Sequence, residues 1–206
     1  MSDTSVMPTR PLGDSGIDVS IIGLGCNNFG RRVDLEGTRA VIDAAIGDGI
    51  TFLDTADIYG PDGLSEQLMG EALKGKRDQV VLATKFGMDM HDGAEHRGRP
   101  EYVRQAAENS LRRLQTETID YYWMHQPDEG TPIADTLGAL QEYAGARELA
   151  MTDVAIGALL AQDGVTSVIA GATRPEQVHA NAAAARWSPS AADLSALNEV
   201  LAAHPL

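Results

Sequence analysis

The segment Phe52-Leu53-Asp54-Thr55-Ala56-Asp57-Ile58-Tyr59-Gly60 joins a short apolar run to a polar turn. The apolar run ends in the carboxylate of Asp54, and Tyr59 follows five residues later. Short apolar runs bounded by turn residues are typical of buried strands. The segment therefore predicts a strand that carries a titratable side chain at its carboxyl end.

Two further segments have the same form. Residues 80–85 form an apolar run that ends in Lys85, and residues 121–125 form one that ends in His125. The three segments together supply a set of side chains suited to proton transfer: Asp54, Tyr59, Lys85 and His125.

Helices are predicted between the strands. Strands are expected at residues 21–25, 51–54, 79–85, 119–125 and 165–170, and helices are expected to begin near residues 34, 64, 100, 131 and 173. Alternating strands and helices form right-handed βαβ units around a parallel sheet, which makes this an α/β protein. In such sheets ligands bind at the carboxyl ends of the strands. The proton-transfer set and the glycine turns at Gly25 and Gly171 should therefore meet at one site.

Several local signals set the limits of these elements. Residues 10–20 are expected to form a hairpin with its turn at Ser15-Gly16. Asp34 can cap the first helix, and Pro100 suits the first position of the third. The arginines that lie off the apolar face of that third helix are expected to face solvent rather than bind an anion: Arg104, Arg112 and Arg113.

Composition excludes several functional classes. The 206 residues suffice for one domain, and 16 basic against 30 acidic residues give a net charge of −14. This acidity argues against nucleic acid or an anionic membrane as partner. No apolar run approaches the roughly 20 residues of a membrane span, and residues 1–10 lack the apolar core of a signal peptide. The single cysteine, Cys26, fits a reducing cytoplasm.

A metal site is not predicted. His91 and His96 lie five residues apart in a polar loop, which is a poor arrangement for metal ligands.

The proton-transfer set suggests a chemistry. A free phenol, with a pKa of about 10, is too weak an acid at neutral pH, but a nearby positive charge favours the phenolate. A tyrosine beside a lysine can therefore protonate a carbonyl oxygen, while a carboxylate pairs with the lysine and a histidine orients the carbonyl or relays a proton. Protonation is half of a carbonyl reduction. The other half is a hydride, which implies a nicotinamide cofactor.

Each of these residues also has a purely structural explanation. Asp54 could cap a loop, Tyr59 could pack, Lys85 could form a surface ion pair and His125 could lie in the core. Those explanations are favoured for each residue alone. They are much less favoured for four such residues at successive strand ends.

The chain closely resembles the aldo-keto reductases, almost from end to end. The matching motifs are Arg10-Pro11-Leu12-Gly13, Gly23-Leu24-Gly25, residues 49–60 and 83–87, Ser110-Leu111-Arg112-Arg113-Leu114, residues 119–122 and 125–128, and residues 168–177 with Asn181. The resemblance implies a (β/α)₈ TIM barrel and NADPH-dependent reduction of aldehydes or ketones. It implies that Tyr59 is the general acid, that Lys85 and Asp54 tune it, and that His125 orients the substrate.

The resemblance also implies where NADP(H) binds. The residues expected at the adenosine 2′-phosphate and adenine are Gly171, Thr173, Arg174, Gln177 and Asn181. A helix N-terminus suits an anion, and arginine suits a phosphate better than a ribose hydroxyl, which favours NADP over NAD. Asp54 and the turn at Cys26-Asn27 are expected near the nicotinamide ribose.

The chain is shorter than the family pattern. A barrel of this kind needs about 250 residues and eight strands, whereas the sequence predicts five. We expect a single domain over residues 1–206 with an internal deletion near residues 140–143, which removes the family's fifth to seventh strands. Those strands carry, in the family, the residues that bind the nicotinamide carboxamide and stack on its ring.

The deletion leaves several alternatives open. The chain is an NADPH-dependent oxidoreductase, or a catalytically impaired NADP-binding or regulatory remnant of the family, or a deletion product that does not fold stably. A partial barrel exposes two sheet edges and an apolar inner face, so we expect either a homo-oligomer that covers them or marginal stability.

Overall fold

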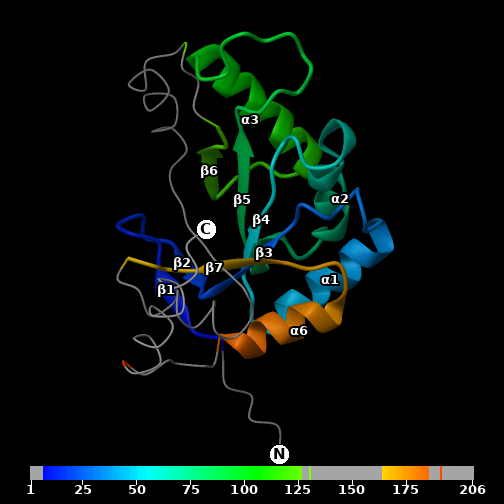
Figure 1. The fold of residues 1–206 in the computed structure, drawn as a ribbon, viewed down its shortest axis with the longest axis vertical. Coiled ribbons are helices and arrows are strands. Elements are labelled where there is room, and N and C mark those ends of the chain that lie inside the picture. The colour runs from blue at the N-terminus through cyan, green and yellow to red at the C-terminus, as the bar shows by residue number, and fades with distance from the viewer. Residues whose placement is uncertain (1–6, 127–129, 131–163, 186–190, 192–206) are drawn as a thin grey trace, which may run out of the picture.

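The computed structural model describes residues 7–126, 130, 164–185 and 191 (Figure 1). Within them, five strands form one parallel sheet in the order β6-β5-β4-β3-β7. The strands are β3 (Ile22–Gly25), β4 (Phe52–Asp54), β5 (Val81–Phe86), β6 (Tyr121–Met124) and β7 (Val168–Gly171). The predicted α/β class and parallel sheet are therefore confirmed. The last strand of this sheet, β7, lies beside its first strand, β3, as the last and first strands of a TIM barrel do. These five strands nevertheless form an incomplete barrel.

A separate hairpin precedes the sheet, as predicted. Its strands β1 (Thr9–Pro11) and β2 (Asp18–Ser20) pair antiparallel. Leu12 and Val19 are buried against Phe52 of β4, so the hairpin covers part of the inner face of the sheet.

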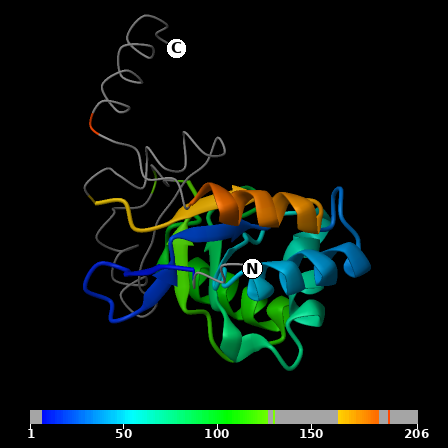
Figure 2. The same cartoon turned by 90° about the horizontal axis from the view of Figure 1, so that it is seen from below.

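In the described part of the chain, four α-helices pack on the outer face of the sheet. They are α1 (Leu35–Gly47), α2 (Leu64–Ala72), α3 (Pro100–Leu114) and α6 (Pro175–Ala184), with short 3₁₀ helices η1 (Pro61–Gly63) and η2 (Arg77–Gln79). Figure 2 shows α1 and α6 side by side, and the two helices are in contact. The predicted caps are confirmed, since the Asp34 carboxylate accepts a hydrogen bond of 2.9 Å from Gly37 N and Pro100 is the first residue of α3.

The main hydrophobic core lies between helices and sheet. Leu53 of β4 and Leu82 of β5 are completely buried there, against residues of α1 and α2 such as Ile42 and Met69. Because successive strand residues point to opposite faces, Asp54 points the other way, toward the inner face. The strand register thus decides which side chains can meet inside the partial barrel.

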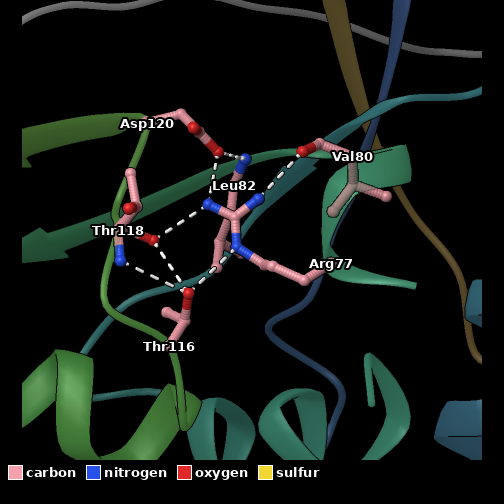
Figure 3. A network of polar contacts seen from close by, with 6 residues as sticks. All are labelled: Arg77, Val80, Leu82, Thr116, Thr118 and Asp120. Carbon is pink, nitrogen blue, oxygen red and sulfur yellow. Dashed lines mark hydrogen bonds and ion pairs between the residues drawn. The ribbon is translucent and has the colours of Figure 1, made fainter. Parts of the chain in front are cut away.

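A polar network fixes the start of β5 against the start of β6 (Figure 3). The Arg77 guanidinium donates to Asp120 Oδ2 at 2.6 Å and to the carbonyls of Thr118 and Val80 at 2.9 and 3.0 Å. The same Asp120 oxygen accepts the backbone N–H of Leu82 at 2.7 Å. These bonds connect the residues before β6 to β5. They thereby support the register in which Lys85 of β5 lies opposite Trp123 of β6.

Some predictions fall outside the described residues. They include the helix expected near residue 131 and the junction near residues 140–143. None of the described helices combines the length and apolar character that a membrane span needs.

Candidate active site

Asp54 and Lys85 meet on the inner face of the sheet. Asp54 ends β4 and pairs in register with Ala83 of β5, so Lys85 lies two residues further along β5 on the same face. The Lys85 ammonium donates to Asp54 Oδ2 at 2.6 Å and to the carbonyl of Thr55 at 2.7 Å. Asp54 and Lys85 are only 6% and 8% exposed, so this ion pair is shielded from water.

Tyr59 completes the arrangement from the loop after β4. Its hydroxyl lies 3.3 Å from Lys85 Nζ, and the ammonium lies 4.7 Å from the centre of the ring. Backbone hydrogen bonds hold the loop on both sides of Tyr59: Asp57 N donates to the Lys85 carbonyl at 3.1 Å, and Ser65 N donates to the Tyr59 carbonyl at 2.9 Å. The phenol is therefore fixed beside the ammonium.

His125 faces Tyr59 from the end of β6. Its backbone N–H donates to the Phe86 carbonyl at 2.7 Å, which continues the β5–β6 pairing by one residue. The imidazole packs edge-on against the phenol ring, with 5.6 Å between ring centres and an angle of 86°. All four predicted proton-transfer residues thus lie together.

The electrostatics of the site follow from burial and from Lys85. Burial raises the pKa of Asp54 above its ordinary value, while the charge and hydrogen bond of Lys85 oppose that shift. Burial lowers the pKa of His125, and the positive charge of Lys85 lowers it further. The imidazole is therefore mainly neutral at neutral pH, and a protonated histidine beside the ammonium is disfavoured.

The predicted adenosine segment forms the turn between β7 and α6. The Gln177 side-chain oxygen accepts hydrogen bonds from Thr173 N at 2.8 Å and from Thr173 Oγ1 at 2.9 Å, which fixes the turn. Arg174 is exposed directly before α6, 3.6 Å from Glu176 Oε2. Asn181 is buried one turn further along the helix than Gln177.

The turn after β3 lies beside this segment. Gly25 pairs in register with Gly171, and a Cβ placed on Gly171 would lie 3.6 Å from Asn27 Oδ1. Cys26 is buried: its N–H donates to the Asp54 carbonyl at 2.8 Å and its carbonyl accepts from Ser65. Cys26 therefore fixes the turn, while Asn27 is exposed at its surface. The roles of Cys26 and Asn27 at a ribose stay predictions.

One prediction about the helices is wrong. Arg113 does not face solvent: its Nε donates at 2.6 Å to Glu66 Oε2 on α2, and its side chain is 20% exposed. Glu66 is completely buried, and its other oxygen accepts the Thr84 hydroxyl at 2.6 Å. Helices α2 and α3 approach closely here, since a Cβ on Gly70 of α2 would lie 2.8 Å from the carbonyl oxygen of Arg113 of α3. A buried carboxylate needs a partner, and that long-range pairing was not visible in the helix pattern.

The sequence reasoning also missed Trp123. It lies in β6 two residues before His125, and the centre of its ring is 5.8 Å from Lys85 Nζ. The alternation of strand residues could have found it, since Trp123 and His125 have the same parity along the strand.

Comparison with known proteins agrees with this fold. An incomplete parallel barrel with helices on its outer face corresponds to part of the TIM-barrel fold. The sequence model of the aldo/keto reductase family matches residues 21–146, more than half of the chain. The chain belongs to the aldo/keto reductase family.

Solved structures of the family are similar over nearly the whole chain. One is aldo-keto reductase AKR11C1 from Bacillus halodurans in its holo form, with a TM-score of 0.82 and 26% identity over 94% of this chain and 96% of that one. Another is an aldo-keto reductase from Klebsiella pneumoniae in complex with NADPH, with a TM-score of 0.78 and 22% identity over 95% of each chain.

Proposed function

We propose that this protein reduces small aldehydes or ketones to alcohols with NADPH, using Tyr59 as the general acid. The observation that carries the proposal is the position of the Lys85 ammonium, 2.6 Å from Asp54 Oδ2 and 3.3 Å from the Tyr59 hydroxyl. Membership of the aldo/keto reductase family supports the same class of reaction.

Tyr59 would supply the proton. Its O–H bond breaks as the carbonyl oxygen of the substrate accepts the proton, and the ammonium of Lys85 stabilises the phenolate that remains. Asp54 and the Thr55 carbonyl hold that ammonium in place, so the stabilising charge is already positioned before the reaction starts.

His125 would orient the carbonyl. Its lowered pKa keeps the imidazole neutral, so one ring N–H can donate to the carbonyl oxygen without adding a second cation beside Lys85. The edge-on contact with Tyr59 brings this donor and the acid to the same substrate atom.

The residues present fit a nicotinamide nucleotide. Asp54 Oδ1 is buried and has no hydrogen-bond partner of standard geometry among the described residues, so it can accept a ribose hydroxyl. Arg174, exposed at the start of α6, would bind the 2′-phosphate, with Gly171, Thr173, Gln177 and Asn181 around the adenosine. When bound, the cofactor supplies the hydride.

The first test is a fluorescence titration of the purified protein with NADPH, with NADH as control. Saturable binding that prefers NADPH, followed by oxidation of NADPH with 4-nitrobenzaldehyde at 340 nm, is the expected result. Binding without turnover of any aldehyde or ketone tested would contradict the reductase and favour the NADP-binding remnant. The absence of binding by a cooperatively folded protein would contradict both.

A further inference from the structure

Trp123 lies on the inner face of the sheet next to the Asp54–Lys85 pair. In the β5–β6 ladder Trp123 is directly opposite Lys85, so the two side chains leave the sheet on the same face. The indole packs edge-on against Tyr121, with 5.7 Å between ring centres and an angle of 84°. Its orientation is thus set by its own strand.

Besides His125 Nδ1, two buried polar atoms on this face lack a partner of standard hydrogen-bond geometry among the described residues. One is the indole Nε1 of Trp123, which can only donate, and the other is Asp54 Oδ1, which can only accept when ionised. A buried donor and a buried acceptor that both stay unpaired are costly, and one hydrogen bond between the two would satisfy both. Burial raises the pKa of Asp54, whereas the charge and hydrogen bond of Lys85 and, after them, the Trp123 N–H oppose that rise.

We propose that Trp123 is a positioning residue whose indole N–H binds Oδ1 of Asp54. With Oδ1 held by Trp123, Oδ2 keeps the Lys85 ammonium beside the Tyr59 hydroxyl. A carboxylate oxygen has two lone pairs, so the same Oδ1 can also accept a ribose hydroxyl. The contact itself is independent of the proposed function, and only its effect on turnover rests on that function.

Packing alone is the competing explanation. The Trp123 ring lies 5.8 Å from Lys85 Nζ, within cation–π distance, and an aromatic ring of any kind would provide that contact. Trp123→Phe separates the two explanations, because phenylalanine keeps an aromatic ring and removes the N–H.

The contact can be measured without any enzyme activity. Protein labelled with ¹⁵N-tryptophan gives two indole signals, from Trp123 and Trp187, which Trp187→Phe assigns. We expect Asp54→Asn to shift the Trp123 indole signal and to speed its hydrogen exchange by about fivefold or more, because a hydrogen bond to a neutral amide oxygen is weaker than one to a carboxylate. Asp57→Asn, which removes another buried carboxylate, should leave the signal in place. A Trp123 signal that ignores Asp54→Asn overturns the proposal.

A second measurement covers the case in which Asp54→Asn does not fold. The ¹³C signal of the Asp54 carboxyl should titrate at higher pH in Trp123→Phe than in the wild type, and an unchanged titration overturns the proposal. If the protein turns over carbonyl substrates, Trp123→Phe should lower kcat about tenfold and leave the KM for NADPH unchanged. A kcat equal to wild type also overturns the proposal, whereas failure of the wild type itself to react contradicts only the proposed function.

Discussion

The ammonium of Lys85 lies 3.3 Å from the hydroxyl of Tyr59. Its two shorter hydrogen bonds, to Asp54 Oδ2 and the Thr55 carbonyl, fix the nitrogen from the other side. The phenol is thus the group toward which the remaining ammonium proton can point. The only charge that the described residues place within hydrogen-bond distance of the Tyr59 hydroxyl is therefore a fixed positive one.

Tyr59→Phe should abolish turnover, because the variant keeps the ring but lacks the proton donor. We expect kcat to fall by about 10²–10⁴, which is the usual contribution of general acid catalysis, while NADPH affinity stays nearly unchanged. Steady-state kinetics and a nucleotide titration measure the two quantities. Tyr102→Phe removes a hydroxyl that contacts Asp92 instead and should keep the wild-type rate. A Tyr59→Phe enzyme with wild-type kcat would rule out Tyr59 as the acid.

Removal of the Lys85 charge should change the titration of His125. The pKa of His125 is lowered first by burial and then by the positive charge of Lys85. Lys85→Met removes the second cause, so the pKa of His125 should rise toward its ordinary value. NMR titration of the imidazole C–H signals, assigned with His125→Gln, measures the shift. A pKa of His125 that stays the same or falls in Lys85→Met would show that the two side chains are not coupled.

Arg174→Ala should weaken NADPH binding about tenfold or more and change NADH binding little, because a charge-assisted bond to phosphate would be lost. Arg99→Ala is a matched control, since Arg99 is also exposed directly before a helix that begins with proline. Fluorescence titrations of the wild type and both variants with NADPH and with NADH give the six affinities. Equal losses for NADPH and NADH would mean that Arg174 does not contact the 2′-phosphate.

Local patterns predicted most of the fold. The apolar runs gave the five parallel strands, and Asp34 and Pro100 marked helix starts because capping depends only on neighbouring residues. The positions of Asp54 and Lys85 followed from the rule that strand ends meet at one edge of a sheet.

Long-range pairing could not be predicted in the same way. The polar face of its helix predicts that Arg113 faces solvent, and only the packing of α2 against α3 reveals Glu66 beneath it. The relation of Trp123 to Asp54 spans three strands and depends on the register of two ladders. The spacing of residues in the sequence does not determine either register. In the structure, the Arg77–Asp120 contact supports the register of β5 against β6.

Arg113→Met should destabilise the fold strongly, because it leaves the completely buried Glu66 without its cation. We expect a loss of about 3 kcal/mol in the free energy of unfolding, and a smaller loss when Glu66→Gln is added to the same chain. Urea denaturation of both single variants and the double variant measures the coupling. Arg112→Met, next to it but exposed, should stay within about 0.5 kcal/mol of the wild type. Additive effects of the two buried substitutions would contradict the pairing.

Asp57→Asn should stabilise the protein at alkaline pH and much less at acid pH. Burial raises the pKa of Asp57 to about 7, the charge of Glu66 adds to the shift, and Arg113 opposes it. Between pH about 4 and about 7 the folded state therefore keeps a proton that the unfolded state has lost, so stability falls as pH rises, by on the order of 4 kcal/mol in total. Asparagine cannot ionise, so the Asp57→Asn variant does not lose stability in this way as the pH rises.

Urea denaturation at pH 5 and pH 8 tests the sign directly. The difference in unfolding free energy between Asp57→Asn and the wild type should widen from pH 5 to pH 8. Asp62→Asn, which removes an exposed carboxylate in the neighbouring η1, is the control for the loss of a carboxylate that is not buried. An Asp57→Asn difference that is the same at both pH values would mean that Asp57 ionises freely in the folded state. A difference that widens would show that the buried Asp57 carboxylate lacks a partner that balances its charge. Asp57 lies in the loop that carries Tyr59, and its backbone N–H attaches that loop to the Lys85 carbonyl.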